Sequence, residues 1–307
     1  MNYKKTLILI DNNNNNFFPD KIGENRVLNI YKSNAYLNRV FRKILFKIHF
    51  PLMKIFFTDW DKEAKKSDLI ILFDTGNAKY LLPYLKKKYK DSKIILWYWN
   101  PVSKSIDPSD VDYEDIEVWS FDPEDCKKYG FKYNTQFFVN SNIERAVKCN
   151  LDEFDVFFIG TDKGRHGELI KLKELFDSIG AKYHFHIVGD TQKEIPGFES
   201  NYLKPLSYFQ LLGYDIRSKV IVDIVSEGQN GLTLRPLEAM FLNKKLITNF
   251  KKIKEYDFYD PQNIFILGVD DPADLKKFIF SDYKYVDEKI KLSYDITAWL
   301  SRFDDER

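Results

Sequence analysis

The sequence is poor in the residues that build disulfide or zinc scaffolds. Its 307 residues include two cysteines, Cys126 and Cys149, and four histidines. No CxxC pair is present, so neither a disulfide framework nor a structural zinc site is expected. The low cysteine content fits a reducing, cytoplasmic environment.

A charge excess of either sign is also missing. The chain has 47 basic and 46 acidic side chains, which gives a formal net charge of +1. Such a balance provides no general attraction to nucleic acid, so nucleic acid is not expected as a partner. Any site for an anion must therefore be local.

Long hydrophobic runs are absent as well. No run reaches the ~18 apolar residues that a membrane-spanning helix needs. The opening segment, MNYKKTLILID, has too short an apolar core for a signal peptide and lacks a small-residue cleavage site. We therefore expect a cytoplasmic protein.

Apolar residues are nevertheless plentiful, at 44% of the chain, with 16% aromatic residues. Buried-strand runs alternate with helical segments along the whole length. The main predicted strands are 6–11, 67–74, 93–99, 116–122, 135–139, 155–161, 183–190, 220–226, 244–248 and 263–268. Continuous apolar strands separated by helices are typical of parallel sheets covered on both faces.

The alternation weakens near 140–153 and then restarts. We therefore predict two domains, an N-terminal one over 1–145 and a C-terminal one over 146–285. The remaining segment, 286–307, is predicted to form a helix that crosses back to the first domain. The expected fold class is α/β, with two Rossmann-like doubly wound domains that face a central cleft. Ligands of such sheets bind beyond the carboxyl ends of the strands.

One polar loop follows the strand at 155–161. Gly160 ends that strand, and Lys163 and Arg165 precede a predicted helix that begins near 167. A helix N-terminus with two neighbouring cations suits a phosphate group. Solvated loop charges are the alternative interpretation of the two cations. Neither a dinucleotide fingerprint nor a P-loop is present.

A second loop, GLTLRPLEAM (231–240), follows the strand at 220–226. Gly231 would let the backbone approach a ligand, and Thr233 and Arg235 could bind a diphosphate. Glu238 lies in the first turn of the next helix, where a carboxylate could grip ribose hydroxyls. The alternative is that Glu238 only interacts with the helix dipole.

The segment from Tyr202 to Thr248 resembles the carboxyl-terminal half of GT-B glycosyltransferases, especially those of bacterial capsule, exopolysaccharide and lipopolysaccharide synthesis. The matching pieces are Glu227, the pair Gly231-Leu232, and the LEAM motif around Glu238. The resemblance implies that Glu238 binds the donor ribose and that Lys163 and Arg165 neutralise the diphosphate. It implies a nucleotide-diphosphate sugar as donor, UDP-linked, with no cofactor and no metal. It also implies that 1–145 is the acceptor-binding domain and that 146–285 is the nucleotide-sugar-binding domain.

The match departs from the family in one respect. Retaining members usually have seven residues between their two glutamates, whereas ten separate Glu227 from Glu238 here. The sequence therefore does not decide between retention and inversion of the anomeric configuration. For an inverting reaction, Asp11 and Asp74 are the candidate catalytic bases, because each ends an apolar strand of the first domain. Both could instead cap the loops that follow.

Other motifs favour structural roles. The acidic motifs at 59–61 and 110–112 resemble a metal-binding DxD but are interpreted as surface acids. His184 and His186 share one face of a strand, which indicates packing rather than a metal pair. The aromatic run 97–99 could stack on a sugar ring, although buried packing is the safer interpretation.

Basic and apolar residues mix at helical spacing over 32–57, and 84–90 adds further lysines. Such a segment can lie on an anionic bilayer, so peripheral contact with the inner membrane face is one expectation. An ordinary helix with a solvated basic face is the other. The sequence as a whole predicts a metal-independent hexosyltransferase that acts on a glycan or lipid-linked acceptor. A non-catalytic nucleotide-sugar-binding protein and a nucleotide-sugar epimerase are the alternatives.

Overall fold

The computed structural model describes residues 5–11, 17–33, 36–47, 51–75, 77–147, 153–161, 165–189, 203–225 and 228–304. The chain forms two compact units. Unit 1 contains residues 1–135 and 299–307, and unit 2 contains residues 136–298. Unit 1 thus ends at residue 135, ten residues before the domain boundary at 145 that the sequence predicts.

Unit 1 is built on a seven-stranded sheet in the order β2-β3-β1-β4-β5-β6-β7. All neighbouring strands are parallel except β2 and β3. The strands are β1 (Thr6–Ile10), β2 (Lys21–Ile22), β3 (Asn25–Asn29), β4 (Leu69–Phe73), β5 (Lys93–Tyr98), β6 (Glu117–Ser120) and β7 (Lys132–Tyr133). Strands β1 and β4 are buried along their whole length, as their uninterrupted apolar runs predict.

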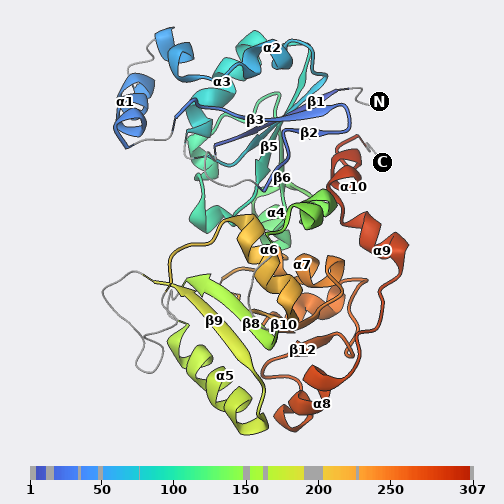
Figure 1. Ribbon diagram of the computed structural model, residues 1–307. Helices are drawn as coiled ribbons and strands as arrows, with labels where there is room; N and C mark the ends of the chain where they lie inside the picture. The colour runs from blue at the N-terminus through green and yellow to red at the C-terminus, as the bar shows by residue number, and fades with distance from the viewer. Residues whose placement is uncertain are drawn as a thin grey trace. The chain divides into compact units, whose positions relative to one another are not determined.

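Figure 1 shows the helices of unit 1 beside this sheet, with α1 set apart from it. They are α1 (Tyr36–Lys47), α2 (Trp60–Ala64), α3 (Ala78–Lys88) and α4 (Pro123–Tyr129), with short 3-10 turns η1 (Pro51–Phe56), η2 (Val102–Lys104) and η3 (Pro108–Asp110). Buried side chains of α2 and α3 join those of β1, β4 and β5 in one core on one face of the sheet. Helix α4 is fixed at both ends: Asp122 caps its N-terminus, and Gly130 ends it in the left-handed conformation.

The opposite face of this sheet is covered by the end of the chain. The Trp299 ring lies 5.2 Å from the Trp97 ring, and the Phe303 ring lies 4.9 Å from the Trp119 ring. The Asn134 side chain donates to the Trp299 carbonyl at 3.1 Å. Residues 299–304 therefore complete the core of unit 1. The helical segment expected over 286–307 is divided into α9 (Glu288–Ser293) and α10 (Ile296–Ser301).

Unit 2 is built on a five-stranded parallel sheet in the order β12-β11-β10-β8-β9. Its strands are β8 (Phe154–Thr161), β9 (Tyr183–Val188), β10 (Ser218–Asp223), β11 (Lys245–Thr248) and β12 (Ile264–Ile266). Its helices are α5 (His166–Ile179), α6 (Tyr208–Arg217), α7 (Arg235–Phe241), α8 (Leu275–Phe280) and α9, with turns η4 (Asn140–Arg145), η6 (Lys251–Glu255) and η7 (Pro272–Asp274). Helices α5 and α8 pack on one face of the sheet, and α6 and α7 lie against β10 (Figure 1).

The segment 135–139 is not the strand that its sequence, TQFFV, predicts. Only Phe138 pairs, through an isolated bridge to Asp295. Its N–H donates to the Tyr294 carbonyl at 2.8 Å, and its ring lies 4.6 Å from the Phe241 ring. Two neighbouring apolar residues, Phe137 and Val139, are also buried, so the run packs in the core without joining a sheet. These contacts explain why the chain enters unit 2 before the expected boundary.

Within the described parts of the chain, no helix has both the length and the apolar character needed to cross a bilayer.

Candidate functional site

Each sheet has a point where the strand order reverses. In unit 2, β9 lies on one side of β8 and β10 on the other. The loops that follow β8 and β10 therefore leave the sheet in the gap where ligands of doubly wound folds bind. These are the two loops that the sequence predicts to bind the donor.

The first loop leads from β8 into α5. Arg165 folds back over the end of the strand, where its Nη1 donates to the Thr161 carbonyl at 3.2 Å. A Cβ added to Gly160 would lie 2.8 Å from that Nη1 atom and 2.9 Å from the Phe158 ring. A side chain at position 160 would therefore displace the Arg165 guanidinium from its present place. Burial lowers the pKa of Arg165, while the charges of Asp223 and Glu168 oppose that shift.

The second loop leads from β10 into α7, and a buried ion cluster closes it. The Nη1 atom of Arg235 donates to both carboxylate oxygens of Asp215, at 3.0 and 2.9 Å. The same nitrogen lies 2.9 Å from Oε2 of Glu238. Asp215 on α6 is fully buried, and Glu238 is 2% exposed. The structure therefore brings Arg235 and Glu238 together. The Arg235 guanidinium is held by the carboxylates of Asp215 and Glu238.

Asp223, the last residue of β10, extends this cluster. It is buried, and it accepts a hydrogen bond of 2.7 Å from the Thr233 hydroxyl. Burial raises the pKa of Asp223, and the neighbouring charges of Arg235 and Arg165 counteract part of the rise. Thr233 is thus tied to the strand end. Burial likewise raises the pKa of Asp215 to about 7, although Arg235 opposes this shift.

Sequence reasoning missed both Asp215 and Asp223. Each interrupts an otherwise apolar run, LLGYDI on α6 and VIVDIV at the end of β10. An acid within a buried run signals a charged partner inside the fold. That signal could have identified the two residues, but not their partner Arg235.

The glycines of the second loop differ in what they require. Gly228 has φ +80°, a conformation that side-chain-bearing residues rarely adopt. Gly231 is buried in the bend before α7 and does not have a positive φ. The remaining donor-site candidates, Lys163 and Glu227, lie outside the described residues.

In unit 1 the strand order reverses between β1 and β4, because β3 follows β1 on the other side. Asp11 comes directly after β1, and Asp74 comes directly after β4. The Thr75 hydroxyl donates to Oδ2 of Asp11 at 3.2 Å. Both candidate bases thus lie at the same edge of the sheet, at its reversal point.

The surroundings of Asp74 give it a loop-holding role as well. Its carboxylate accepts the N–H of Trp99 at 3.0 Å and the N–H of Asn100 at 3.2 Å. Burial raises the pKa of Asp74 to about 6, and these hydrogen bonds oppose the rise. The Trp99 ring packs 5.0 Å from Phe73 and 5.6 Å from Phe18. Trp97 and Tyr98 are buried, as the packing interpretation predicts.

The remaining polar motifs have structural partners. Asp110 and Asp112 pair with Lys79 and Lys86 at 2.7 and 3.4 Å. The His184 ring stacks on Tyr214 at 5.3 Å. His186 makes a hydrogen bond of 2.8 Å to the Lys204 carbonyl, so packing and hydrogen bonding account for the histidine pair. Burial lowers the pKa of both rings.

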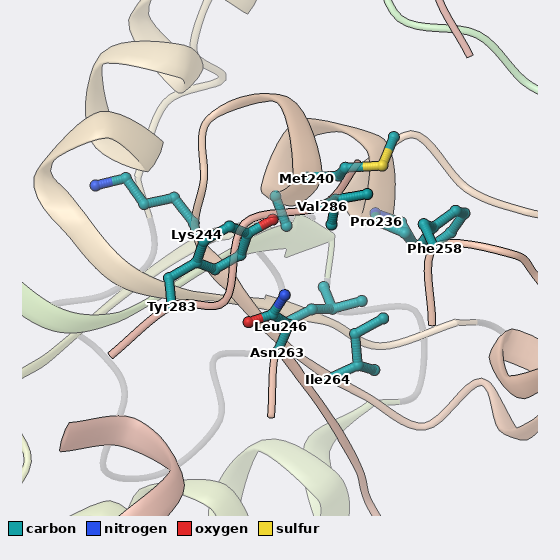
Figure 2. Close-up of a pocket in the computed structure, with 10 residues that line it drawn as sticks. Pro236, Met240, Lys244, Leu246, Phe258, Asn263, Ile264, Tyr283 and Val286 are labelled. Carbon is teal, nitrogen blue, oxygen red and sulfur yellow. The ribbon is translucent and has the colours of Figure 1, made fainter. Parts of the chain in front are cut away.

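Two hollows of unit 2 do not suit a diphosphate. The cavity in Figure 2 lies between α7, β11 and β12 and has a volume of about 10 Å³. Side chains such as Met240, Leu246 and Ile264 surround it, and it has room for about one water molecule. A larger hollow of about 720 Å³ beside β12 is lined by Asp270, Asp271 and Asp274, whose charges repel an anion.

No protein-family model matches the chain, and none of the curated proteins matches it. Among solved structures, it is similar to AviGT4, a glycosyltransferase involved in avilamycin A biosynthesis. That similarity has a TM-score of 0.53 and 8% sequence identity, and it covers 98% of this chain and 96% of that one. Sucrose-phosphate synthase from Thermosynechococcus elongatus is also similar, with a TM-score of 0.51 and 11% identity over 95% of this chain and 85% of that one.

The chain has the GT-B fold. Two Rossmann-like units, each with a parallel sheet covered by helices, follow one another along the chain. The expected α/β fold class with two Rossmann-like domains is thereby confirmed.

Proposed function

We propose that the protein is a glycosyltransferase that moves a hexose from a nucleotide-diphosphate sugar, UDP-linked, to a hydroxyl of a glycan or lipid-linked acceptor. The observation that carries this proposal is the position of the charged loops. They leave the sheet of unit 2 where its strand order reverses, on a fold shared with glycosyltransferases. Surface polysaccharide synthesis is the proposed context, on the strength of the LEAM segment.

Donor binding is assigned to unit 2. The guanidinium of Arg165 lies next to Gly160, and Arg165 directly precedes α5. Arg165, Lys163 and the N-terminus of α5 would together neutralise the diphosphate. Glu238 would bind the ribose. Gly231 would let the backbone come close to the diphosphate, and Thr233 would lie beside it. The sequence predicts Arg235 as a further diphosphate ligand. Because its Nη1 atom lies within 3.0 Å of the carboxylates of both Asp215 and Glu238, Arg235 would instead orient Glu238.

Acceptor activation is assigned to unit 1. Both candidate bases have hydrogen-bond donors beside them: Asp11 accepts from the Thr75 hydroxyl, and Asp74 accepts two backbone N–H groups of the loop after β5. Asp11 would take the proton of the acceptor hydroxyl, and Asp74 would keep the β5 loop in place. Fixed cations would stabilise the leaving diphosphate without a metal.

A donor panel tests the proposal. The full chain is incubated with UDP-, GDP- and ADP-linked sugars in the presence of EDTA, and released nucleoside diphosphate is measured together with the thermal midpoint. We expect one donor to raise the midpoint and to be turned over slowly by hydrolysis. The test variant is Arg165→Ala, which should weaken donor binding, and its matched control is Lys171→Ala, which lies within α5 and outside the loop.

Each outcome separates the candidate functions. A midpoint shift without release of diphosphate would identify a binding protein. Conversion of the donor sugar without any acceptor would identify an epimerase. Loss of turnover in EDTA would contradict metal independence. The proposed location is cytoplasmic, in peripheral contact with the anionic inner face of the membrane.

A further inference from the structure

Helix α1 presents an apolar stripe that the described part of the chain leaves uncovered. Leu37 is 67% exposed, Phe41 55% and Ile44 52%, and Val40 between them is 37% exposed. These positions are spaced by three and four residues, so they lie on one face of the helix. Figure 1 shows α1 at the margin of unit 1, away from the sheet.

The opposite side of α1 is anchored to unit 1. Arg42 is 1% exposed, and its guanidinium lies 3.9 Å from the centre of the Tyr31 ring. The same side chain donates a hydrogen bond to the Ser33 carbonyl. Tyr31 is itself buried and forms a bridge with Phe57. Because one side of the helix is fixed in this way, the apolar stripe must face outward.

A neighbouring turn continues the exposed surface. Ile55 on η1 is 56% exposed, and its carbonyl accepts a hydrogen bond of 3.2 Å from Nζ of Lys32. We define the α1 surface as these exposed apolar side chains: Leu37, Val40, Phe41, Ile44 and Ile55. Single exposed apolar residues are common, but a continuous patch on one helix face marks an interaction surface.

The charge of the same segment is one-sided. Between positions 32 and 58 the sequence has no acidic residue, and its basic residues are Lys32, Arg39, Arg42, Lys43, Lys47 and Lys54. The chain as a whole has almost equal numbers of basic and acidic residues. The segment that contains the apolar stripe therefore carries a net positive charge in its sequence.

We propose that the α1 surface is the part of the protein that docks on an anionic lipid bilayer, an inference that rests on the peripheral membrane contact proposed above. A short amphipathic helix with basic residues beside its apolar face lies in the plane of the lipid headgroups and inserts its apolar side chains. With 12 residues, α1 is about 18 Å long, too short to span the ~30 Å hydrocarbon core. A second copy of this chain is a poorer occupant, because two basic segments would repel one another.

Vesicle co-sedimentation of the full chain tests this proposal. The probe vesicles contain phosphatidylcholine alone or with 30% phosphatidylglycerol, at low and at high salt. The variant Leu37→Ser/Ile44→Ser removes two side chains of the α1 surface. Its matched control, Ile216→Ser/Leu292→Ser, makes the same changes in unit 2, where these residues are 41% and 48% exposed.

We expect binding only to the anionic vesicles, with strong weakening at 1 M salt, where the Debye length falls to about 3 Å. The Leu37→Ser/Ile44→Ser variant should bind about 30-fold more weakly, and the control should bind like the wild type. Should the double variant lose its thermal transition, Ile55→Ser outside α1 is expected to weaken binding about fivefold.

Equal binding of both double variants would overturn the proposal, and so would equal binding to neutral vesicles. Sedimentation velocity in the absence of lipid provides the remaining outcome. A dimer that the Leu37→Ser/Ile44→Ser variant dissolves would show that a second copy covers the α1 surface. No sugar enters these measurements, so their failure would leave the proposed transferase activity standing.

Discussion

Replacement of Asp215 by alanine probes the buried ion cluster of unit 2. Asp215 is fully buried, and the side chain of Arg235, its partner, is 12% exposed. Removal of one member of a buried ion pair typically costs about 3 to 5 kcal/mol, because the other charge is left without compensation. Arg235 keeps Glu238 at 2.9 Å, so the lower end of this range, about 3 kcal/mol, is expected.

The corresponding change in thermal stability is measurable by calorimetry. For a unit of this size, 1 kcal/mol shifts the midpoint by about 2–4 °C, so Asp215→Ala should lower it by about 6–12 °C. Asp177→Ala is the matched control, because Asp177 forms an exposed i,i+4 pair with Lys173 at 2.9 Å on α5. Surface pairs contribute less than about 1 kcal/mol, so the control should lose no more than about 4 °C.

The same variant should also weaken the donor site. Without Asp215, Arg235 is free to change its orientation, and Glu238 loses the partner that positions it. We expect the Kd for UDP to rise about tenfold in Asp215→Ala and to stay unchanged in Asp177→Ala. Equal loss of stability in the two variants would refute the assignment of Arg235 and Asp215 as a buried pair. Unchanged UDP affinity would refute the positioning role.

Three further predictions follow from named contacts. Gly160→Ala should destabilise the protein by about 1–2 kcal/mol in urea unfolding and weaken donor binding, because its Cβ would approach Arg165 to 2.8 Å. Its control is Gly167→Ala, which should be neutral or slightly stabilising because an added Cβ would meet no atom within 4 Å. Asp11→Asn should lower kcat by about 100-fold or more at unchanged donor affinity, whereas Asp74→Asn should mainly lower the midpoint; a larger kcat effect for Asp74 would reverse the assignment. Burial raises the pKa of the Cys126 thiol to about 11. At pH 8 the thiol should therefore be alkylated about 100-fold more slowly than an ordinary cysteine, and the alkylation rate should rise about tenfold per pH unit. Rapid labelling of Cys126 in peptide mass spectra would contradict its burial.

The strands of both sheets could be predicted because their runs are continuous and apolar. LIILF in β4 and VIV within β10 have no period that a surface helix could use. The hairpin of β2 and β3 was missed, because Lys21–Ile22 is two residues long and polar residues interrupt β3. Gly23, with φ +58° at its turn, was the available signal.

Only those features of the candidate site that short stretches of sequence encode could be predicted. Loops after strands and the LEAM segment identified Gly160, Arg165 and Glu238 as neighbours of one sheet edge. The partner of Arg235 could not be found in this way, because Asp215 lies twenty residues earlier on a different helix. Which carboxylate an arginine meets is decided by how α6 and α7 pack against β10, and that packing is a tertiary property.

A crystal structure of the full chain with bound UDP tests the central claim most directly. We predict that the diphosphate lies between the end of β8 and the start of α5, within hydrogen-bond distance of Arg165, and that the ribose faces Glu238. A nucleotide bound at the reversal point of unit 1, or in the acidic hollow beside β12, would contradict the assignment of the donor site.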